Sequence, residues 1–206
     1  FRQMSNLMVW VYDTLKYDGE LIIDTHKFNS LNIISRTEKK GISSNCWMYA
    51  TVLNEVFLAM GFKSRRIRCM SADLEDKECH CVTIVYSNEF NKWIMFDAAN
   101  KAFFVDKQAL PMSLQELRES LITEQKIYLP KATTSDFEKI KRYWYKNIVR
   151  FQAYSHSAFN FESSKKEKKI YNLNPKAIVV EDKVTFNNRV KQNYINISNP
   201  NIFWRI

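Results

Sequence analysis

One cysteine, one histidine and one aspartate in the first half of the chain have the types and the order that thiol chemistry needs. Cys46 lies in the segment Gly41–Ala50, His80 follows 34 residues later, and Asp97 ends the segment Lys92-Trp-Ile-Met-Phe-Asp97. A lone thiol is a weak nucleophile near neutral pH, and a helix start with a neighbouring imidazole converts it to thiolate. The three residues are therefore candidates for a nucleophile, a general base and an orienting carboxylate.

The segment that begins at Cys46 has the apolar spacing of a helix. Apolar residues follow the cysteine at steps of four, three, four and three, which is one face of a helix with 3.6 residues per turn. These residues are Ala50, Leu53, Phe57 and Met60. Because this face is the buried one, simple packing of Cys46 in the core is the alternative to catalysis.

Both ends of this helix carry residues typical of caps. Ser43, Ser44 and Asn45 are the candidate N-caps, because their side-chain oxygens can accept hydrogen bonds from the free amides of the first turn. Gly61 can adopt the left-handed conformation that follows a helix. Cys46 is thus expected at the positive end of the helix dipole, which favours thiolate over thiol.

Two later segments alternate as β-strands do. Residues 79–86 place His80 on one side of a strand, and residues 92–97 place Asp97 on one face of another. The intervening residues 87–91 can reverse the chain. The pattern predicts a β-hairpin that carries both polar side chains.

The length of the turn decides whether His80 faces Asp97. With a loop of residues 87–90, Tyr86 pairs with Asn91 and His80 lies directly opposite Asp97, where a carboxylate could orient the imidazole. Any loop with an odd number of residues would put the two on opposite faces. The sequence therefore permits this geometry without requiring it.

Taken together, these segments resemble those of the transglutaminase-like superfamily. The likeness rests on residues 41–68, on Cys79-His80-Cys-Val-Thr-Ile-Val-Tyr-Ser and on Lys92-Trp-Ile-Met-Phe-Asp97. Within the first segment it rests on Asn45-Cys46, Ala50, Leu53, Met60-Gly61-Phe62 and Ser64-Arg65. The resemblance is strongest to bacterial transglutaminase-like proteins. It covers about residues 7–110 and continues weakly to the C-terminal segment Asn199–Trp204.

The resemblance implies an α+β fold of the papain-like type, in which the helix bearing Cys46 packs on an antiparallel sheet bearing His80 and Asp97. It assigns Cys46 as the nucleophile, His80 as the general base and Asp97 as the residue that orients the base. Ala98-Ala99 departs from the family, which usually has a proline and a small polar residue after the aspartate. It also favours a secreted or cell-envelope location, although the residues themselves leave the compartment open.

The implied chemistry is acyl transfer on amide bonds through a thioester, as in a cysteine peptidase or amidase acting on a protein or peptide. The backbone amide of Cys46 would meet the oxyanion, with Asn45 as a candidate side-chain donor, while Trp47 is expected to pack. Water is favoured as the acceptor of the acyl group, because transfer to an amine would require a cleft that excludes water. Transglutaminase-type cross-linking or deamidation is an alternative, and a non-catalytic peptide- or polysaccharide-binding module is another. This chemistry needs no cofactor or metal.

Composition agrees with one globular domain. The 206 residues are 46% hydrophobic and 14% aromatic, which argues against disorder. We expect a single domain over residues 1–206, with a catalytic-type core at 1–110 and a helical and strand extension at 111–206 packed on it. No apolar run approaches the roughly 18 residues of a membrane helix. Oligomeric state is not specified by these features.

The charge of the chain is strongly positive but dispersed. A net charge of +9 would suit an acidic partner such as nucleic acid. The basic residues are spread along the chain, however, and the densest run, residues 163–169, is expected to be a solvated loop. The pattern argues against a nucleic-acid partner.

The four cysteines do not have the pattern of a disulfide framework. Cys79 and Cys81 flank His80, so a zinc site deserves comparison, but with Cys69 ten residues before Cys79 the spacing is not a usual zinc motif. These three cysteines are expected to pack on sheet faces.

The remaining patterns predict scaffold elements. They are a helix with Met4, Leu7, Met8, Val11 and Leu15, a short helix capped by Asn29 or Ser30, a helix opened by the capping box Ser113–Glu116, a helical stripe from Phe137 to Phe151, and strands within residues 176–206 at Ile178–Val180 and Tyr194–Ile197.

Overall fold

The computed structural model describes residues 1–21, 28–130, 137–187 and 189–205 as an α+β fold. Its described helices are α1 (Arg2–Thr14), α2 (Ser30–Lys40), α3 (Cys46–Ala59), α4 (Leu114–Ile122), α5 (Phe137–Asn147) and α6 (Pro200–Arg205). Its described strands are β1 (Ser64–Met70), β2 (Cys79–Ser87), β3 (Lys92–Phe96), β4 (Arg150–Tyr154), β5 (Lys168–Leu173), β6 (Lys183–Asn187) and β7 (Val190–Ile197).

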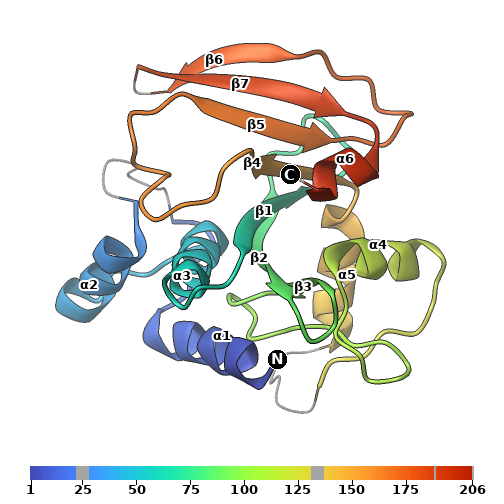
Figure 1. Cartoon of the computed structure of the whole chain (residues 1–206), viewed down its shortest axis with the longest axis horizontal. Helices are drawn as coiled ribbons and strands as arrows, with labels where there is room; N and C mark the ends of the chain where they lie inside the picture. Colours follow the sequence, from blue (N-terminus) through green and yellow to red (C-terminus); the bar gives the residue numbers. More distant parts are fainter. Residues whose placement is uncertain (22–27, 131–136, 188, 206) are drawn as a thin grey trace.

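The strands form one sheet in the order β3-β2-β1-β4-β5-β7-β6 (Figure 1). Every neighbouring pair is antiparallel except β5 and β7, which are parallel. The predicted α+β class, with the cysteine-bearing helix packed on the sheet, is confirmed. The sheet is mixed instead of purely antiparallel, because β6 pairs with β7 as a hairpin at the edge and so turns β7 into the direction of β5.

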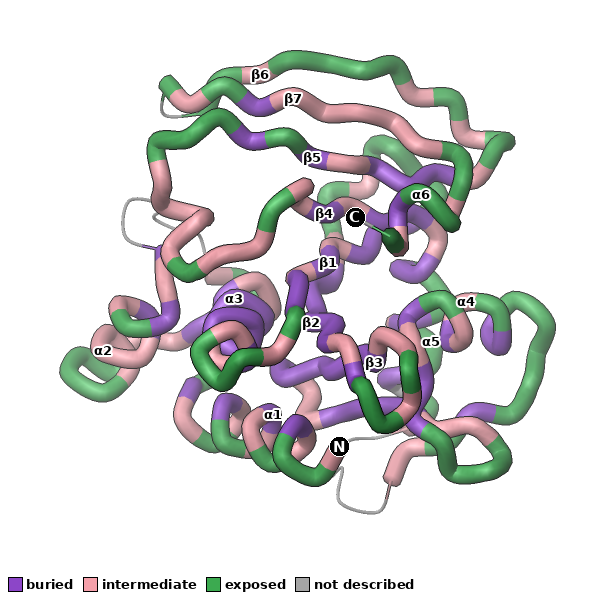
Figure 2. The backbone as a smooth tube through the Cα atoms, viewed as in Figure 1, coloured by how far each residue is buried: buried purple, intermediate pink, exposed green. Residues whose placement is uncertain are grey.

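Helices cover the two faces of the sheet separately. The helices α1, α2 and α3 gather on one side of β1–β3, and α4 and α5 gather on the other (Figure 1). Alternation along β2 sends Val85 into the apolar cluster under α1 and α3, while Val82 and Ile84 enter the cluster with Trp144 of α5. Both faces of β2 are therefore buried, and the buried strands and α3 form the centre of Figure 2.

The ends of α3 follow the sequence signals. The Asn45 side chain accepts a hydrogen bond from the Met48 amide, so Asn45 is the N-cap and Cys46 is the first helical residue. Gly61 follows the helix in the left-handed conformation, with φ of 82°. Of the predicted apolar face, Ala50, Leu53 and Phe57 are buried, but Met60 is half exposed because it lies at the C-cap beyond the last turn.

The hairpin loop has an even number of residues, which is the case that keeps His80 and Asp97 on one face, but the register differs from the one considered. Four residues, 88–91, separate β2 from β3, and Tyr86 pairs with Trp93. The prediction that Tyr86 pairs with Asn91 is wrong by two residues, because Ser87 extends β2 and pairs with Lys92. A shift of two keeps every side chain on its face.

Asn29 caps α2, and the capping box of Ser113 and Glu116 caps α4, as predicted. Three other expectations were wrong. Phe151 lies in β4, because α5 ends at Asn147. Ile178–Val180 lies outside the strands, and Val179 is 85% exposed. The basic run is not all solvated: Lys168 begins β5 and is buried, since its ammonium donates to the Ser164 carbonyl and lies over the Phe161 ring.

A buried carboxylate in α3 holds two other segments in place. The Glu55 side chain accepts hydrogen bonds from the Ser30 amide at the start of α2, at 2.6 Å, and from the Asn160 amide, at 2.8 Å. Replacing Glu55 by alanine would leave both amides without this acceptor, so we expect a loss of about 1–3 kcal/mol in the free energy of unfolding. Urea denaturation measures this loss. The matched change at exposed Glu38 of α2 should cost less than about 0.5 kcal/mol, and equal costs would contradict the assignment.

Candidate active site

His80 and Asp97 form a buried hydrogen bond. His80 Nε2 lies 2.7 Å from Asp97 Oδ2, and the two side chains are 2% and 0% exposed. In the observed register the two residues are diagonal neighbours on one face, instead of the direct pair that a loop of residues 87–90 would give, because the pairing is shifted by two residues. Diagonal neighbours are still within reach of long side chains, so the predicted contact forms through a different pairing.

Asn100 holds the carboxylate from its other side. The Asn100 amide donates to Asp97 Oδ1 at 3.2 Å, and its side-chain nitrogen donates to Oδ2 at 2.8 Å. The turn contains Ala98 and Ala99, which replace the residues usual in the resembled family, and it closes through the paired backbone bonds of Asp97 with Ala102. Both alanine side chains are buried. The departure in sequence therefore leaves the carboxylate firmly positioned.

The imidazole is held by aromatic rings as well as by the carboxylate. The rings of Tyr143 and Trp144, both in α5, meet the His80 ring edge-on with centroids 5.2 Å away. The Tyr143 hydroxyl donates to the Cys79 carbonyl at 3.3 Å. Helix α5 thereby fixes the start of β2 and limits the rotation of the imidazole.

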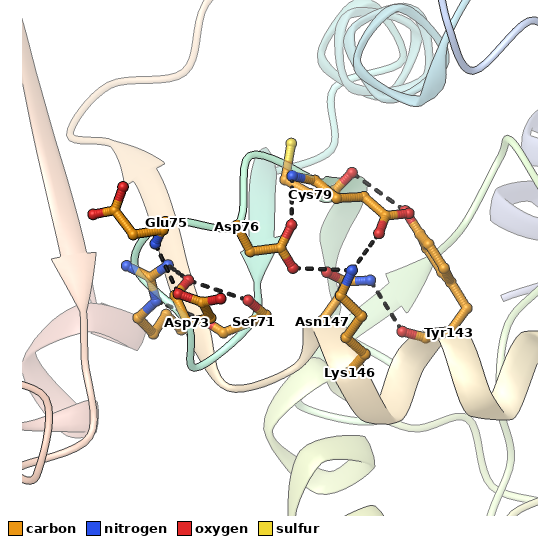
Figure 3. Close-up of polar contacts among 10 residues, drawn as sticks. Ser71, Asp73, Glu75, Asp76, Cys79, Tyr143, Lys146 and Asn147 are labelled. Atoms are coloured by element: carbon orange, nitrogen blue, oxygen red, sulfur yellow. Dashed lines mark hydrogen bonds and ion pairs between the residues drawn. The ribbon is translucent and has the colours of Figure 1, made fainter.

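The connection from β1 to β2 is tied to the same helix (Figure 3). Lys146 of α5 forms ion pairs with Asp76, at 2.9 Å, and with Glu78. At the start of this connection, the guanidinium of Arg150 in β4 donates to the carbonyls of Ser71 and Asp73. The chain therefore enters β2 through a braced loop, immediately before His80.

Cys46 approaches from the opposite side of the sheet. It begins α3, which packs on the face of β2 that carries Thr83, and Thr83 Oγ1 donates to the Ala50 carbonyl at 2.9 Å. Strand β3 pairs with β2 from Thr83 to Ser87, so the first residues of β2 extend beyond it. The Cys46 sulfur lies there, 3.9 Å from the Cys79 carbonyl oxygen. It is half-buried, unlike the core cysteines Cys69 and Cys81.

The surroundings of Cys46 favour its thiolate. The Cys81 thiol, hydrogen-bonded to the Cys46 sulfur, is the largest influence and lowers the pKa; burial opposes it, and His80 and the Cys81 backbone lower it further. The resulting pKa of Cys46 is about 4. A thiol with this pKa is ionised throughout the neutral range, which is the state that attacks a carbonyl.

The surroundings of His80 favour the imidazolium. Burial by itself lowers the pKa of His80, but the charge and hydrogen bond of Asp97, together with Cys46, raise it to about 10. The ring nitrogen turned away from Asp97, Nδ1, is buried and has no fully formed hydrogen bond within the described residues. Since Cys46 and His80 each shift the other toward the charged form, the arrangement can hold a thiolate–imidazolium pair.

Several residues of this arrangement were not predicted from the sequence. Cys81 was expected only to pack, yet it is the strongest influence on the pKa of Cys46. Tyr17, half exposed, is close enough for Cys46 and Asp97 to help burial raise its pKa to about 12. Asn45 was the candidate side-chain donor to the oxyanion. In the structure its side-chain oxygen accepts from the Met48 amide in the helix cap, and its side-chain nitrogen donates to the Leu21 carbonyl. The spacing Asp97-x-x-Asn100 was the signal available for the Asn100 contacts.

Neither a metal-binding cluster nor a membrane-spanning helix is present among the described residues. They contain no group of three or more histidine, cysteine or acidic side chains arranged to hold a metal ion. No helix among them combines the length and the apolar character needed to cross a bilayer.

Comparisons with known proteins give a weak structural likeness. No protein-family model matches the chain, and no curated protein matches it. Among solved structures, the chain is similar to a candidate cysteine protease from Cytophaga hutchinsonii, with 17% sequence identity and a TM-score of 0.35. The match covers 47% of this chain and 30% of that one. At this level of similarity the neighbour does not assign an activity to the chain.

Proposed function

We propose that the protein is a thiol-dependent acyltransferase acting on amide bonds, with Cys46 as nucleophile, His80 as proton carrier and Asp97 as the carboxylate that orients it. The observation that carries this proposal is the buried 2.7 Å contact of His80 with Asp97. The same imidazole lowers the pKa of Cys46, and Cys46 in turn raises the pKa of His80. A structural core cysteine has no need of a buried imidazole–carboxylate pair beside it. Such pairs are typical of activated nucleophiles.

The proposed reaction begins with attack of the Cys46 thiolate on an amide carbonyl. Cys46 is the first residue of α3, so its backbone N–H belongs to the four that lack a partner inside the helix and can stabilise the oxyanion. The His80 imidazolium then protonates the leaving amine as the C–N bond breaks and a thioester forms. Asp97 holds Nε2–H, which leaves Nδ1 as the nitrogen that transfers the proton.

Water completes the reaction in the form we favour. His80, now neutral, takes a proton from water, and the hydroxide attacks the thioester to release an acid and regenerate the Cys46 thiolate. An amine in place of water would give an amide, which is the cross-linking alternative. Mass spectrometry of a peptide mixture containing glutamine and lysine distinguishes the two, because hydrolysis produces cleavage or deamidation and amine transfer produces isopeptide bonds.

Selective alkylation tests the proposed nucleophile without a known substrate. We expect iodoacetamide to modify Cys46 fastest of the four thiols at pH 6–7, with a midpoint of its pH–rate profile near 4. Cys79 is the internal comparison, because the Cys81 thiol, against burial, and Arg68 lower its pKa to about 6. Cys69 and Cys81 are buried with raised pKa values and should react slowly. Peptide mapping after timed labelling measures each rate, and a Cys46 midpoint above 8 would overturn the proposal.

A further inference from the structure

The face of the sheet that α3 covers continues beyond that helix. Direct strand partners lie on the same face, and Arg68 is the partner of both Cys81 in β2 and Gln152 in β4. The same face continues across β4 and β5 through the pair of Tyr154 with Ile170. One sheet surface therefore runs from the thiols beside Cys46 to the C-terminal strands.

Over the C-terminal strands this surface borders a cavity. The connection between β4 and β5 crosses it, passing from β4 beside α3 before reaching β5 (Figure 1). Between the sheet surface and this connection lies a cavity of about 490 Å³, within the 300–1,000 Å³ range of small-ligand sites. Its lining includes Phe28, Trp47, Arg68, Lys165, Lys168 and Tyr194.

Two residues of the cavity lining are neighbours of the candidate site. Trp47, the residue after Cys46, forms part of its wall, and the guanidinium of Arg66 stacks 3.6 Å from the centre of the Trp47 ring. Arg68 forms another part and is close enough to Cys79 to lower the pKa of its thiol. The cavity therefore lies beside the residue that follows Cys46 and beside the partner of the Cys79 thiol.

The charges around the cavity are unbalanced toward positive. Its carboxylate, Glu162, is held in an ion pair with Arg66, at 2.5 Å. Arg68, Lys165 and Lys168 are the basic residues in the lining. The Arg68 guanidinium interacts with the Cys79 thiol, but its Nε is buried and has no hydrogen-bond partner within the described residues. A guanidinium with unused donors favours an anion, most strongly a carboxylate that can accept two bonds.

We propose that this cavity is the specificity site for the acyl donor, and that it binds an acidic side chain, Asp or Glu, of a peptide whose amide lies at Cys46. The assignment rests on the proposed function for the identity of the reacting amide. The aromatic and aliphatic walls, Trp47, Tyr194 and Ile170 among them, enclose the methylene part of the side chain, while Arg68 and Lys165 pair with its carboxylate.

Binding to an inactive variant tests the cavity independently of catalysis. The Cys46→Ala protein is incubated with a positional-scanning library of acetylated hexapeptide amides, and the bound peptides are quantified by mass spectrometry. We expect Asp or Glu to be enriched over Asn or Gln roughly fivefold or more at one position. A synthetic pair of peptides that differ only by Glu and Gln at that position then gives the two dissociation constants.

Variants of the lining assign the preference to this cavity. In the Cys46→Ala background, Arg68→Gln should reduce the affinity for the Glu peptide about tenfold and bring it close to that of the Gln peptide. Lys165→Ala, at an exposed position, should reduce it about two- to fivefold without risk to folding. Lys166→Ala is the matched control, because Lys166 is exposed and outside the lining, and it should change the affinity less than twofold.

Equal binding of the Glu and Gln peptides, or a preference unchanged by both Arg68→Gln and Lys165→Ala, would overturn the assignment. The failure of the proposed function is recognised separately, by slow alkylation of Cys46 in the unmodified protein. Fast alkylation with no acidic preference would leave the nucleophile and remove this specificity site. Slow alkylation with a clear acidic preference would leave a peptide-binding module.

Discussion

Replacing His80 by glutamine is expected to slow the alkylation of Cys46 at pH 6 by about 10- to 30-fold. Glutamine can still donate to Asp97 from a side chain of similar length, but it cannot carry the positive charge that helps hold the Cys46 pKa near 4. The Cys81 thiol and the helix start remain, so the pKa should rise to about 7 to 7.5, below the ordinary value of about 8.5. At that pKa only about 3–10% of the thiol is ionised at pH 6.

The pH dependence separates this electrostatic effect from loss of structure. At pH 9 the thiol of the variant is ionised again, so its alkylation rate should return to within about threefold of the unmodified protein. Turnover of any peptide substrate should fall further, by roughly 10²–10⁴-fold, because proton transfer to the leaving amine is also lost. His156→Gln, a change at an exposed histidine away from the site, is the control and should leave the Cys46 profile unchanged. An unaltered midpoint in His80→Gln would mean that His80 does not act on the thiol.

The parts of the site that the sequence predicted are those set by local periodicity. The helical spacing after Cys46 and the oxygen of Asn45 fixed where α3 starts, because a cap is decided within one turn. Alternation placed His80 and Asp97 each on one face of its own strand, and the even loop of the structure brings the two faces together although the register is two residues from the one considered. Such features depend on neighbours in the chain, which the sequence displays directly.

Long-range packing decided what the sequence could not predict. Phe151 continues the apolar stripe of α5 but lies in β4, since pairing with Cys69 in β1 outweighs helical periodicity after Asn147. Lys168 sits in a basic run that favours solvent, yet its pairing in β5 buries it. The contact between Cys81 and Cys46 joins a strand to a helix on one side of the sheet, and no pattern within either element reports it.

The second large effect is expected from replacing Asp97 by asparagine, a nearly isosteric change. Asparagine can turn its oxygen toward His80 Nε2 and the Asn100 side chain, but its nitrogen then faces the Asn100 amide, which now donates to Oδ1. One hydrogen bond becomes a contact between two donors, so we expect a loss of about 1–3 kcal/mol in the free energy of unfolding. The imidazolium also loses its counter-charge, and burial then lowers the His80 pKa from about 10 to below about 7.

Histidine NMR titration measures this shift directly. The His80 signal should titrate near 10 in the unmodified protein and below about 7 in Asp97→Asn. A His80 signal that still titrates near 10 in the variant would show that another group, and not Asp97, stabilises the imidazolium.

Stability as a function of pH gives an independent measurement of the same pair. The folded-state pKa of Cys46 is depressed, so its contribution is complete above the unfolded value of about 8.5 and is lost as pH falls through about 4. The folded-state pKa of His80 is raised, so its contribution is complete below about 6.5 and is lost as pH rises through about 10. The pair therefore predicts a stability plateau between about pH 6.5 and 8.5. In Asp97→Asn the alkaline decline from His80 should disappear, because the imidazole is already neutral there, and urea denaturation at pH 8 and pH 10 compares the two proteins.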